Sequence, residues 1–261
     1  MDLGLKGKTA FISGGSRGIG FAIAASFAAE GARVAITARG ADALEQARVR
    51  LAETAGEANV VALQADMRLE SDIAGALEET EARLGPLHAV IANAGSGSAQ
   101  SGIELDRAAW QGPLDANLMS SVLLAGLALP LLVAQGSGSM AFMASIAGVE
   151  AISAPLPYAV AKTGLLMAMK SYARQVGRHG VRVNAIAPGN IFFPGGTWAD
   201  KFQDPDKKAF FTDYINDEVA MRRFATPKEI ADTVVFMASR RASFMTGSVV
   251  VIDGGQTRSF I

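Results

Sequence analysis

Two residues in the segment PYAVAK (157–162) have side chains that suit proton transfer. Tyr158 is one of only three tyrosines in the chain, and Lys162 follows it by four positions. Residues four apart on an α-helix lie on the same face, so the phenol and the ammonium are expected in one neighbourhood. A free phenol titrates at about pH 10, and a nearby cation favours its ionised form. The pair predicts a tuned acid–base group if other elements build a site around it.

Four further sites, each with a small polar residue, lie next to apolar runs that are typical of strands or helices. They are Asp66, Asn93-Ala94-Gly95, Asn117 and Ser145. In parallel α/β sheets the carboxyl ends of the strands share one edge, and ligands bind there. We therefore expect these loops to aim polar groups into one crevice.

A glycine-rich turn follows the first predicted strand and opens the first predicted helix. Glycines allow a tight turn and a close approach to a pyrophosphate, and the helix N-terminus offers unpaired N–H groups. The residues predicted to bind a dinucleotide here are Gly14, Ser16, Arg17, Gly18, Ile19 and Gly20. Gly14, Ser16 and Gly18 also match the Gly-x-Ser-x-Gly elbow of serine hydrolases. Neither His88 nor His179 is placed to serve Ser16, which argues against a hydrolase.

The end of the second predicted strand indicates which dinucleotide is bound. NAD-binding folds place a carboxylate about 20 residues after the glycine turn. This chain has Arg39 there instead. Arg39, together with Arg17, suits a 2′-phosphate because guanidinium groups make charge-assisted hydrogen bonds with phosphate oxygens. We predict NADP, with the alternative that both arginines are solvated surface groups.

The elements that must position these residues alternate along the chain. Predicted strands cover 9–13, 33–38, 60–65, 89–93, 139–144, 182–186 and 248–252. Helical periodicity is found at 20–30, 41–55, 70–84 and 227–239. Apolar strands that each precede a helix predict a parallel sheet covered on both faces. Right-handed crossovers then give a doubly wound α/β fold, with 1–261 as a single domain.

One segment, 190–224, departs from that rhythm. It contains six of the thirteen phenylalanines, together with Trp198 and Tyr214. A long insertion in a compact domain is usually a functional loop or lid. We predict a substrate-binding lid that favours an apolar or acyl-bearing ligand. The alternative is a helical hairpin that only packs on the core.

Composition argues against several classes of function. A net charge of −1 over 261 residues gives no reason to expect nucleic acid or an anionic membrane as a partner. The absence of cysteine and the presence of only two histidines argue against a metal site. The apolar run 118–134 is shorter than the ~20 residues that span a bilayer, so we predict a buried or subunit-interface helix. The first residues show no signal-peptide pattern, and a cytoplasmic location is expected.

In their order and spacing, these motifs resemble the short-chain dehydrogenase/reductase family over essentially the whole chain. The matching motifs are SGGSRGIG (13–20), ANAG (92–95), Asn117, Ser145, YAVAK (158–162), PG (188–189) and DGG (253–255). From residue 189 onward the chain looks most like bacterial 3-oxoacyl-thioester (3-oxoacyl-ACP) reductases. The resemblance implies a homotetramer that acts on a small carbonyl or alcohol substrate.

The resemblance also implies a role for each site residue. Tyr158 would be the general acid/base, and Lys162 would bind the nicotinamide ribose and lower the pKa of the tyrosine. Ser145 would hydrogen-bond the substrate oxygen, and Asn117 would hold a water that links the lysine to solvent. The cofactor would also contact Asp66, Asn93, Ala94, Gly95, Pro188, Gly189 and Ile191.

One position departs from the family pattern Pro-Gly-x-Ile-x-Thr, in which the threonine bonds the nicotinamide carboxamide. This chain has Phe193 in the threonine position. The backbone of Ile191 can still reach the carboxamide, and Thr197 would replace the missing hydroxyl if the loop bulges.

Two other functions on the same fold are a non-catalytic dinucleotide sensor and a dehydratase or epimerase. The tyrosine, lysine and serine argue against the sensor, whereas the motifs leave the dehydratase or epimerase open.

Overall fold

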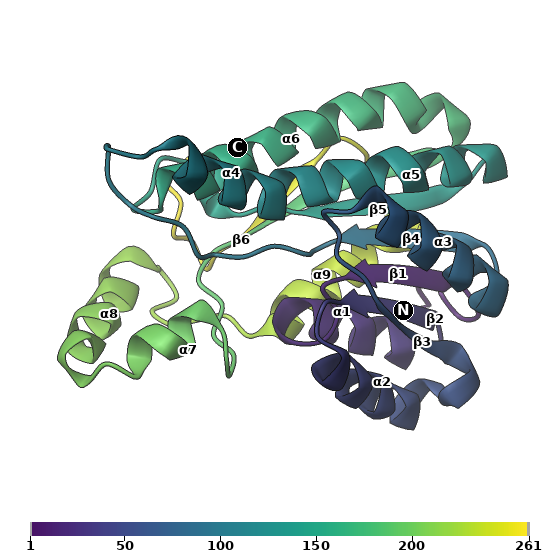
Figure 1. The fold of residues 1–261 in the computed structure, drawn as a ribbon, viewed down its shortest axis with the longest axis horizontal. Helices are drawn as coiled ribbons and strands as arrows, with labels where there is room; N and C mark the ends of the chain where they lie inside the picture. The colour runs from purple at the N-terminus through teal and green to yellow at the C-terminus, as the bar shows by residue number, and fades with distance from the viewer. Residues whose placement is uncertain (1, 260–261) are drawn as a thin grey trace.

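Seven parallel strands form the centre of the molecule in the computed structural model, which describes residues 2–259 (Figure 1). The strands are β1 (Thr9–Ser13), β2 (Arg33–Ala38), β3 (Val60–Gln64), β4 (Leu87–Ala92), β5 (Gly138–Met143), β6 (Val181–Pro188) and β7 (Val249–Ile252). Their order in the sheet is β3-β2-β1-β4-β5-β6-β7. From β1 the chain first adds β2 and β3 on one side, and it then returns to add β4, β5, β6 and β7 on the other side. Doubly wound sheets bind ligands at such a reversal, and the predicted fold class is confirmed.

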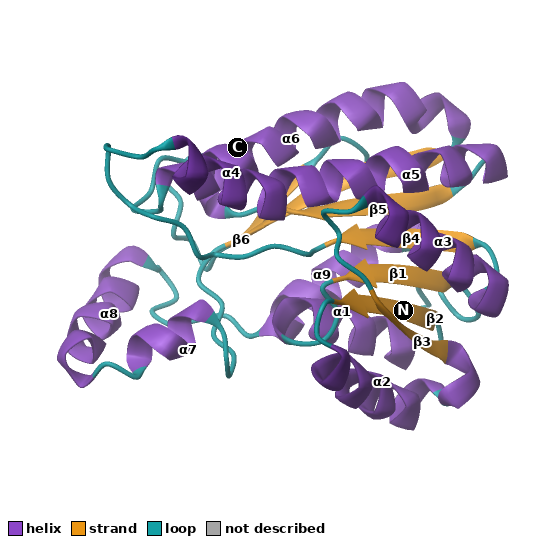
Figure 2. Ribbon diagram, viewed as in Figure 1, coloured by secondary structure: helices purple, strands orange, loops and turns teal. Residues whose placement is uncertain are grey.

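Helices cover both faces of the sheet (Figure 2). One layer consists of α1 (Gly18–Ala29), α2 (Ala41–Ala55) and α9 (Pro227–Ala238). The other consists of α3 (Glu70–Leu84), α4 (Arg107–Leu114), α5 (Ser120–Gln135) and α6 (Leu156–Val176). Successive strand residues point to opposite faces, so Phe11 packs in one core and its neighbour Ile12 in the other. Both cores consist mainly of apolar side chains, which explains why the strands have nearly continuous hydrophobic sequences.

The apolar run 118–134 lies in α5 and the turn before it. Leu124, Ala128 and Leu132 are completely buried, which confirms the prediction of a buried helix. The helical run 107–135 is long and apolar enough to cross a membrane by length and composition, and its most apolar 18-residue window has a mean hydropathy of 2.0. Of its most apolar window, 44% is buried within the fold. Core helices of soluble proteins pass the same test.

The segment 190–224 folds into two short helices, α7 (Thr197–Phe202) and α8 (Pro205–Glu218), which project from the rest of the fold (Figure 1). Its aromatic rings pack on one another: the ring centre of Trp198 lies 5.1 Å from that of Phe224 and 5.9 Å from that of Tyr214. The helical-hairpin alternative therefore describes the secondary structure of this lid segment. Its role in binding substrate stays a prediction.

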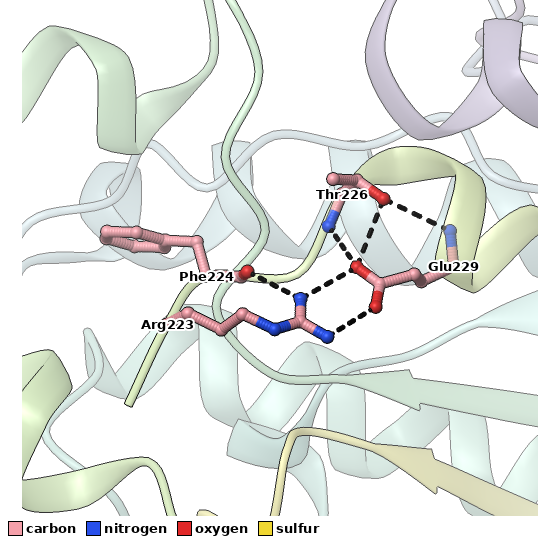
Figure 3. A network of polar contacts seen from close by, with 4 residues as sticks. All are labelled: Arg223, Phe224, Thr226 and Glu229. Carbon is pink, nitrogen blue, oxygen red and sulfur yellow. Dashed lines mark hydrogen bonds and ion pairs between the residues drawn. The ribbon is translucent and has the colours of Figure 1, made fainter. Parts of the chain in front are cut away.

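A polar network fixes the point where the lid segment returns to the core (Figure 3). The Thr226 hydroxyl accepts from the backbone N–H of Glu229, and the Glu229 carboxylate accepts from the backbone N–H of Thr226 at 2.8 Å. This capping box begins α9. Arg223 donates to both carboxylate oxygens of Glu229, at 2.7 and 3.0 Å. The bonds from Arg223, followed by that from the Thr226 backbone, lower the pKa of Glu229 to about 2.

Candidate active site

Tyr158 and Lys162 lie on one face of α6, as their spacing predicts. The Lys162 Nζ is 5.6 Å from the centre of the Tyr158 ring. Lys162 is only 5% exposed, and its ammonium donates a 2.8 Å hydrogen bond to the carbonyl of Met143 at the end of β5. Burial lowers the pKa of Lys162 to about 8. The ammonium is thus held at the carboxyl edge of the sheet, beside the phenol.

Ser145 stands directly after β5 and reaches the same place. Its side chain lies close enough to the Tyr158 hydroxyl to influence the pKa of the phenol. Burial raises the pKa of the Tyr158 phenol, and the nearby Ser145 side chain acts in the opposite direction by a smaller amount. The tyrosine is therefore protonated at neutral pH in this structure, which is the form that a general acid requires.

Asn117 lies in a π-helical turn between α4 and α5 (Asp115–Met119) and is 1% exposed. Its amide Nδ2 donates to the Ser96 carbonyl at 2.9 Å, and its Oδ1 accepts from the Ser96 backbone N–H at 3.1 Å. A Cβ atom placed on Gly95 would lie 2.7 Å from the Oδ1 of Asn117 and 3.7 Å from the Nζ of Lys162. Gly95 thus leaves room beside its backbone for the side chains of both the asparagine and the lysine. The predicted role of Asn117 in holding a water stays a prediction.

The glycine turn has the shape that a pyrophosphate requires. Gly14 and Gly18 have φ values of +69° and +57°, a region that favours glycine. A Cβ atom on Gly20 would lie 2.1 Å from the carbonyl oxygen of Gly14. No side chain caps the N-terminus of α1, and its first turn contains no acidic residue. The unpaired N–H groups and the partial positive charge of this helix end fit a bound phosphate.

Ser13 and Asn93 join the glycine turn to the loop after β4. The Asn93 amide donates to the carbonyls of Ser13 and Gly14, at 3.0 and 3.1 Å. The Ser13 hydroxyl accepts from the backbone N–H groups of Asn93 and Ala94, at 2.9 and 3.0 Å. Asn93 therefore supports the turn through hydrogen bonds. Ser13 is a supporting residue that sequence reasoning missed, and its signal is a serine that ends an otherwise apolar strand.

Arg39 and Asp66 follow the neighbouring strands β2 and β3. Arg68 donates from Nε to both carboxylate oxygens of Asp66, at 2.9 and 3.1 Å. This bond lowers the pKa of Asp66, and the charge of Arg39 lowers it further by a smaller amount. Sequence reasoning did not single out Arg68, which holds the Asp66 carboxylate in place. The Arg39 residue is exposed, and its backbone carbonyl accepts from the Gln64 amide.

The Pro188–Ile191 stretch is held between β7 and the returning end of the lid segment. The Gly189 N–H donates to the carbonyl of Ile252 at 2.9 Å. Ile191 is 7% exposed and forms a bridge with Ala225. Because β6 lies next to β5 in the sheet, this stretch borders the strand end that carries Ser145.

Three further residues of the glycine turn have different surroundings. Arg17 is exposed at the start of α1, and its Nη1 donates to the Gly195 carbonyl of the lid segment at 2.6 Å. Ser16 is half-buried, and Ile19 packs against the core that contains α1.

Within residues 2–259 no group of three or more histidine, aspartate or glutamate side chains is arranged to hold a metal ion.

The fold and this site together define a dinucleotide-dependent oxidoreductase, and comparisons with known proteins identify the family. Residues 14–257 match the family model described as Enoyl-(Acyl carrier protein) reductase. Levodione reductase of Leifsonia aquatica is 32% identical over 254 residues, covering 97% of this chain and 95% of the relative. A 3-oxoacyl-[acyl-carrier-protein] reductase of Chlamydia muridarum is 31% identical, covering 96% of this chain and 98% of the relative.

Solved structures agree with that assignment. L-sorbose reductase from Gluconobacter frateurii, complexed with NADPH and L-sorbose, has a TM-score of 0.93 at 33% identity and covers all of both chains. A short-chain type dehydrogenase/reductase from Mycobacterium marinum has a TM-score of 0.86 at 29% identity, covering 98% of this chain and 97% of that one. The chain belongs to the short-chain dehydrogenase/reductase family, which confirms the resemblance seen in its sequence.

Proposed function

We propose that this protein is a carbonyl reductase that interconverts a ketone and a secondary alcohol. The observation that carries the proposal is that the Tyr158 phenol lies beside Ser145 and beside the buried ammonium of Lys162, whose Nζ is 5.6 Å from the centre of the ring. Its cofactor is NADP, as indicated by the NADPH bound in the similar L-sorbose reductase. The arginine at position 39, where NAD enzymes have an acid, agrees with that choice. The bound nicotinamide supplies the hydride for reduction.

Residues of the protein itself carry out the proton transfer. Tyr158 gives its proton to the carbonyl oxygen, while the Ser145 hydroxyl hydrogen-bonds the same oxygen as negative charge develops on it. The Lys162 ammonium then stabilises the phenolate that remains. This stabilisation acts against the burial that raises the pKa of the Tyr158 phenol.

Consumption of NADPH with a panel of ketones tests this function. Reduction that depends on Tyr158 supports it, and a lower KM for NAD than for NADP would contradict the cofactor assignment. A protein that binds NADPH but converts no ketone would be a sensor. Conversion of a substrate without consumption of NADPH would indicate a dehydratase or an epimerase.

We further propose an apolar ketone, such as a 3-oxoacyl thioester, as the substrate. Similarity to 3-oxoacyl-[acyl-carrier-protein] reductases and to levodione reductase supports this class. The aromatic content of the lid segment supports it less than the sequence suggested, because those rings pack on one another.

A polar ketose is the competing substrate class. The amides of Asn190 and Gln256 and the hydroxyl of Tyr214 form a chain of hydrogen bonds, each of 2.8 Å, one strand away from Ser145. The similar L-sorbose reductase acts on such a sugar. A comparison of kcat/KM for acetoacetyl thioesters, a cyclic diketone and L-sorbose separates the two classes.

We also propose that the protein is a cytoplasmic homotetramer. Large apolar side chains are exposed along the layer of α5 and α6, namely Met119, Leu131, Leu156, Val160 and Met167. Contact between copies of the chain would remove this apolar surface from water. Light scattering should give a mass four times that of one chain, and a monomeric mass would contradict the proposal.

A further inference from the structure

Phe193, which replaces the family's threonine, lies against the glycine turn. Its ring is so close to Gly18 that a Cβ atom on that glycine would lie 2.6 Å from two ring carbons. The opposite neighbour is Gly196, where a Cβ atom would lie 2.8 Å from the ring. The ring is thus held between two glycines 178 positions apart in the chain (196 − 18), one at the start of α1 and the other just before α7.

A second contact joins the same two segments. The Nη1 of Arg17 donates to the Gly195 carbonyl at 2.6 Å. Gly195 has a φ of +73°, and the Gly196 N–H closes a turn on the Phe193 carbonyl at 3.1 Å. The turn 193–196 therefore contacts the N-terminus of α1 through both a ring and a guanidinium group.

The turn also reaches toward the loop after β4. Thr197 is the first residue of α7, and its Oγ1 would lie 3.2 Å from a Cβ atom placed on Gly97. The stretch 193–197 thus extends from the glycine turn to the loop that follows Asn93-Ala94-Gly95. These are the two loops that fit the phosphates and the ribose of a dinucleotide.

We propose that Phe193 is a positioning residue for the cofactor: by packing between Gly18 and Gly196 it holds the turn 193–196 over the dinucleotide site and slows the release of NADPH. The inference rests on the proposed use of NADP. It gives Phe193 a role that the threonine in its position cannot perform, because only a large flat side chain fills the space between two glycine backbones. The same packing places the Thr197 hydroxyl on the side of the site that faces Gly97.

A double-mutant cycle on NADPH release tests the proposal. NADPH fluorescence is followed while excess NADP displaces it from the wild type, Phe193→Ala, Gly196→Ala and the double variant. Gly196 has a φ of −92°, which alanine adopts without strain, so the added methyl acts through the ring alone. We expect each single variant to release NADPH about tenfold faster, and the double variant to release it no faster than either one.

Phe210→Ala is the matched control, because Phe210 is a lid phenylalanine that is 67% exposed and packs on Phe211. It should release NADPH at the wild-type rate. Phe193→Leu, which keeps apolar bulk, should restore part of the slow release if the alanine variant folds poorly. An unchanged rate in Phe193→Ala, or effects that multiply in the double variant, would overturn the proposal. Failure of the NADP assignment is distinguishable, because the wild type itself would then not bind NADPH.

Discussion

The proposed catalytic group (Ser145, Tyr158 and Lys162) and the lid segment (190–224) are built by different kinds of contact. The proposed catalytic group stands just after β5 and on α6, and its lysine is hydrogen-bonded to the backbone of the central sheet. The lid segment is held mainly by its own aromatic rings and by contacts at its two ends. The proposed catalytic group and the lid segment therefore depend on separate sets of contacts. Changes in the catalytic group should affect rate, and changes in the lid segment should affect how ligands are held.

The largest effect is expected for Tyr158→Phe. Loss of the proton donor should lower kcat by about a thousandfold or more, since positioned acid–base groups contribute on the order of 10²–10⁴. NADPH affinity should be unchanged, because the ring remains. Single-turnover reduction and a fluorescence titration with NADPH measure the two quantities. Retained activity would rule out the proposed mechanism.

Lys162→Ala should damage both chemistry and cofactor binding. The ammonium is proposed to stabilise the phenolate and to bind the nicotinamide ribose, so we expect kcat to fall about a hundredfold and NADPH affinity about tenfold. Lys162→Met serves as the control for lost bulk, because the side chain is buried. If the methionine variant kept the wild-type rate, the charge would have no part in catalysis.

The pH dependence should reflect the same lysine. Burial lowers the pKa of Lys162 to about 8, so its charge is present below that pH and is lost as pH rises through it. We therefore expect kcat/KM for ketone reduction to fall above about pH 8. A lid variant such as Phe210→Ala should show the same profile. A profile that stays flat to about pH 10, the range of an ordinary lysine, would contradict the assignment.

The smallest effect is expected for Trp198→Ala in the lid segment. Trp198 contacts Phe211, Tyr214 and Phe224, and its loss should loosen the lid segment without unfolding the sheet. We expect the KM for the ketone to rise roughly threefold to tenfold, with little change in kcat or in thermal stability. Tyr158→Phe should instead lower kcat. A loss of global stability comparable to that of a core tryptophan, about 3–5 kcal/mol, would show that the lid segment is part of the core.

Elements made by local pattern were predictable from the sequence. The strands 9–13 and 33–38 and the helices 41–55 and 70–84 have the predicted bounds. The predicted strand 182–186 instead extends over 181–188 as β6, because its pairing with β7 continues to Pro188. Proline has no N–H to donate, which is tolerated at the last residue of a strand. Strand ends depend on neighbours that local sequence does not reveal.

The proximity of Tyr158 and Lys162 was predictable for a similar reason, since the two residues are one helical turn apart. The surroundings of Arg17 and Asn117 were not. Arg17 bonds Gly195, 178 residues away, and the Asn117 amide is fixed by Ser96, 21 residues away. Such contacts depend on how the chain folds back and leave no periodic signal. The helices of the lid segment were foreseen only as the alternative to a loop, because their aromatic residues form a separate small cluster.

The exposed position of Arg39 has a consequence for engineering cofactor preference. The residue lies just beyond β2, whereas the supports of the glycine turn, Ser13 and Asn93, belong to β1 and to the loop after β4. Replacing Arg39 with an acid should therefore shift use toward NAD without disturbing the phosphate cradle. Arg17 offers no such freedom, because a substitution there also releases the lid segment. A redesign would begin at the end of β2 and leave the glycine turn intact.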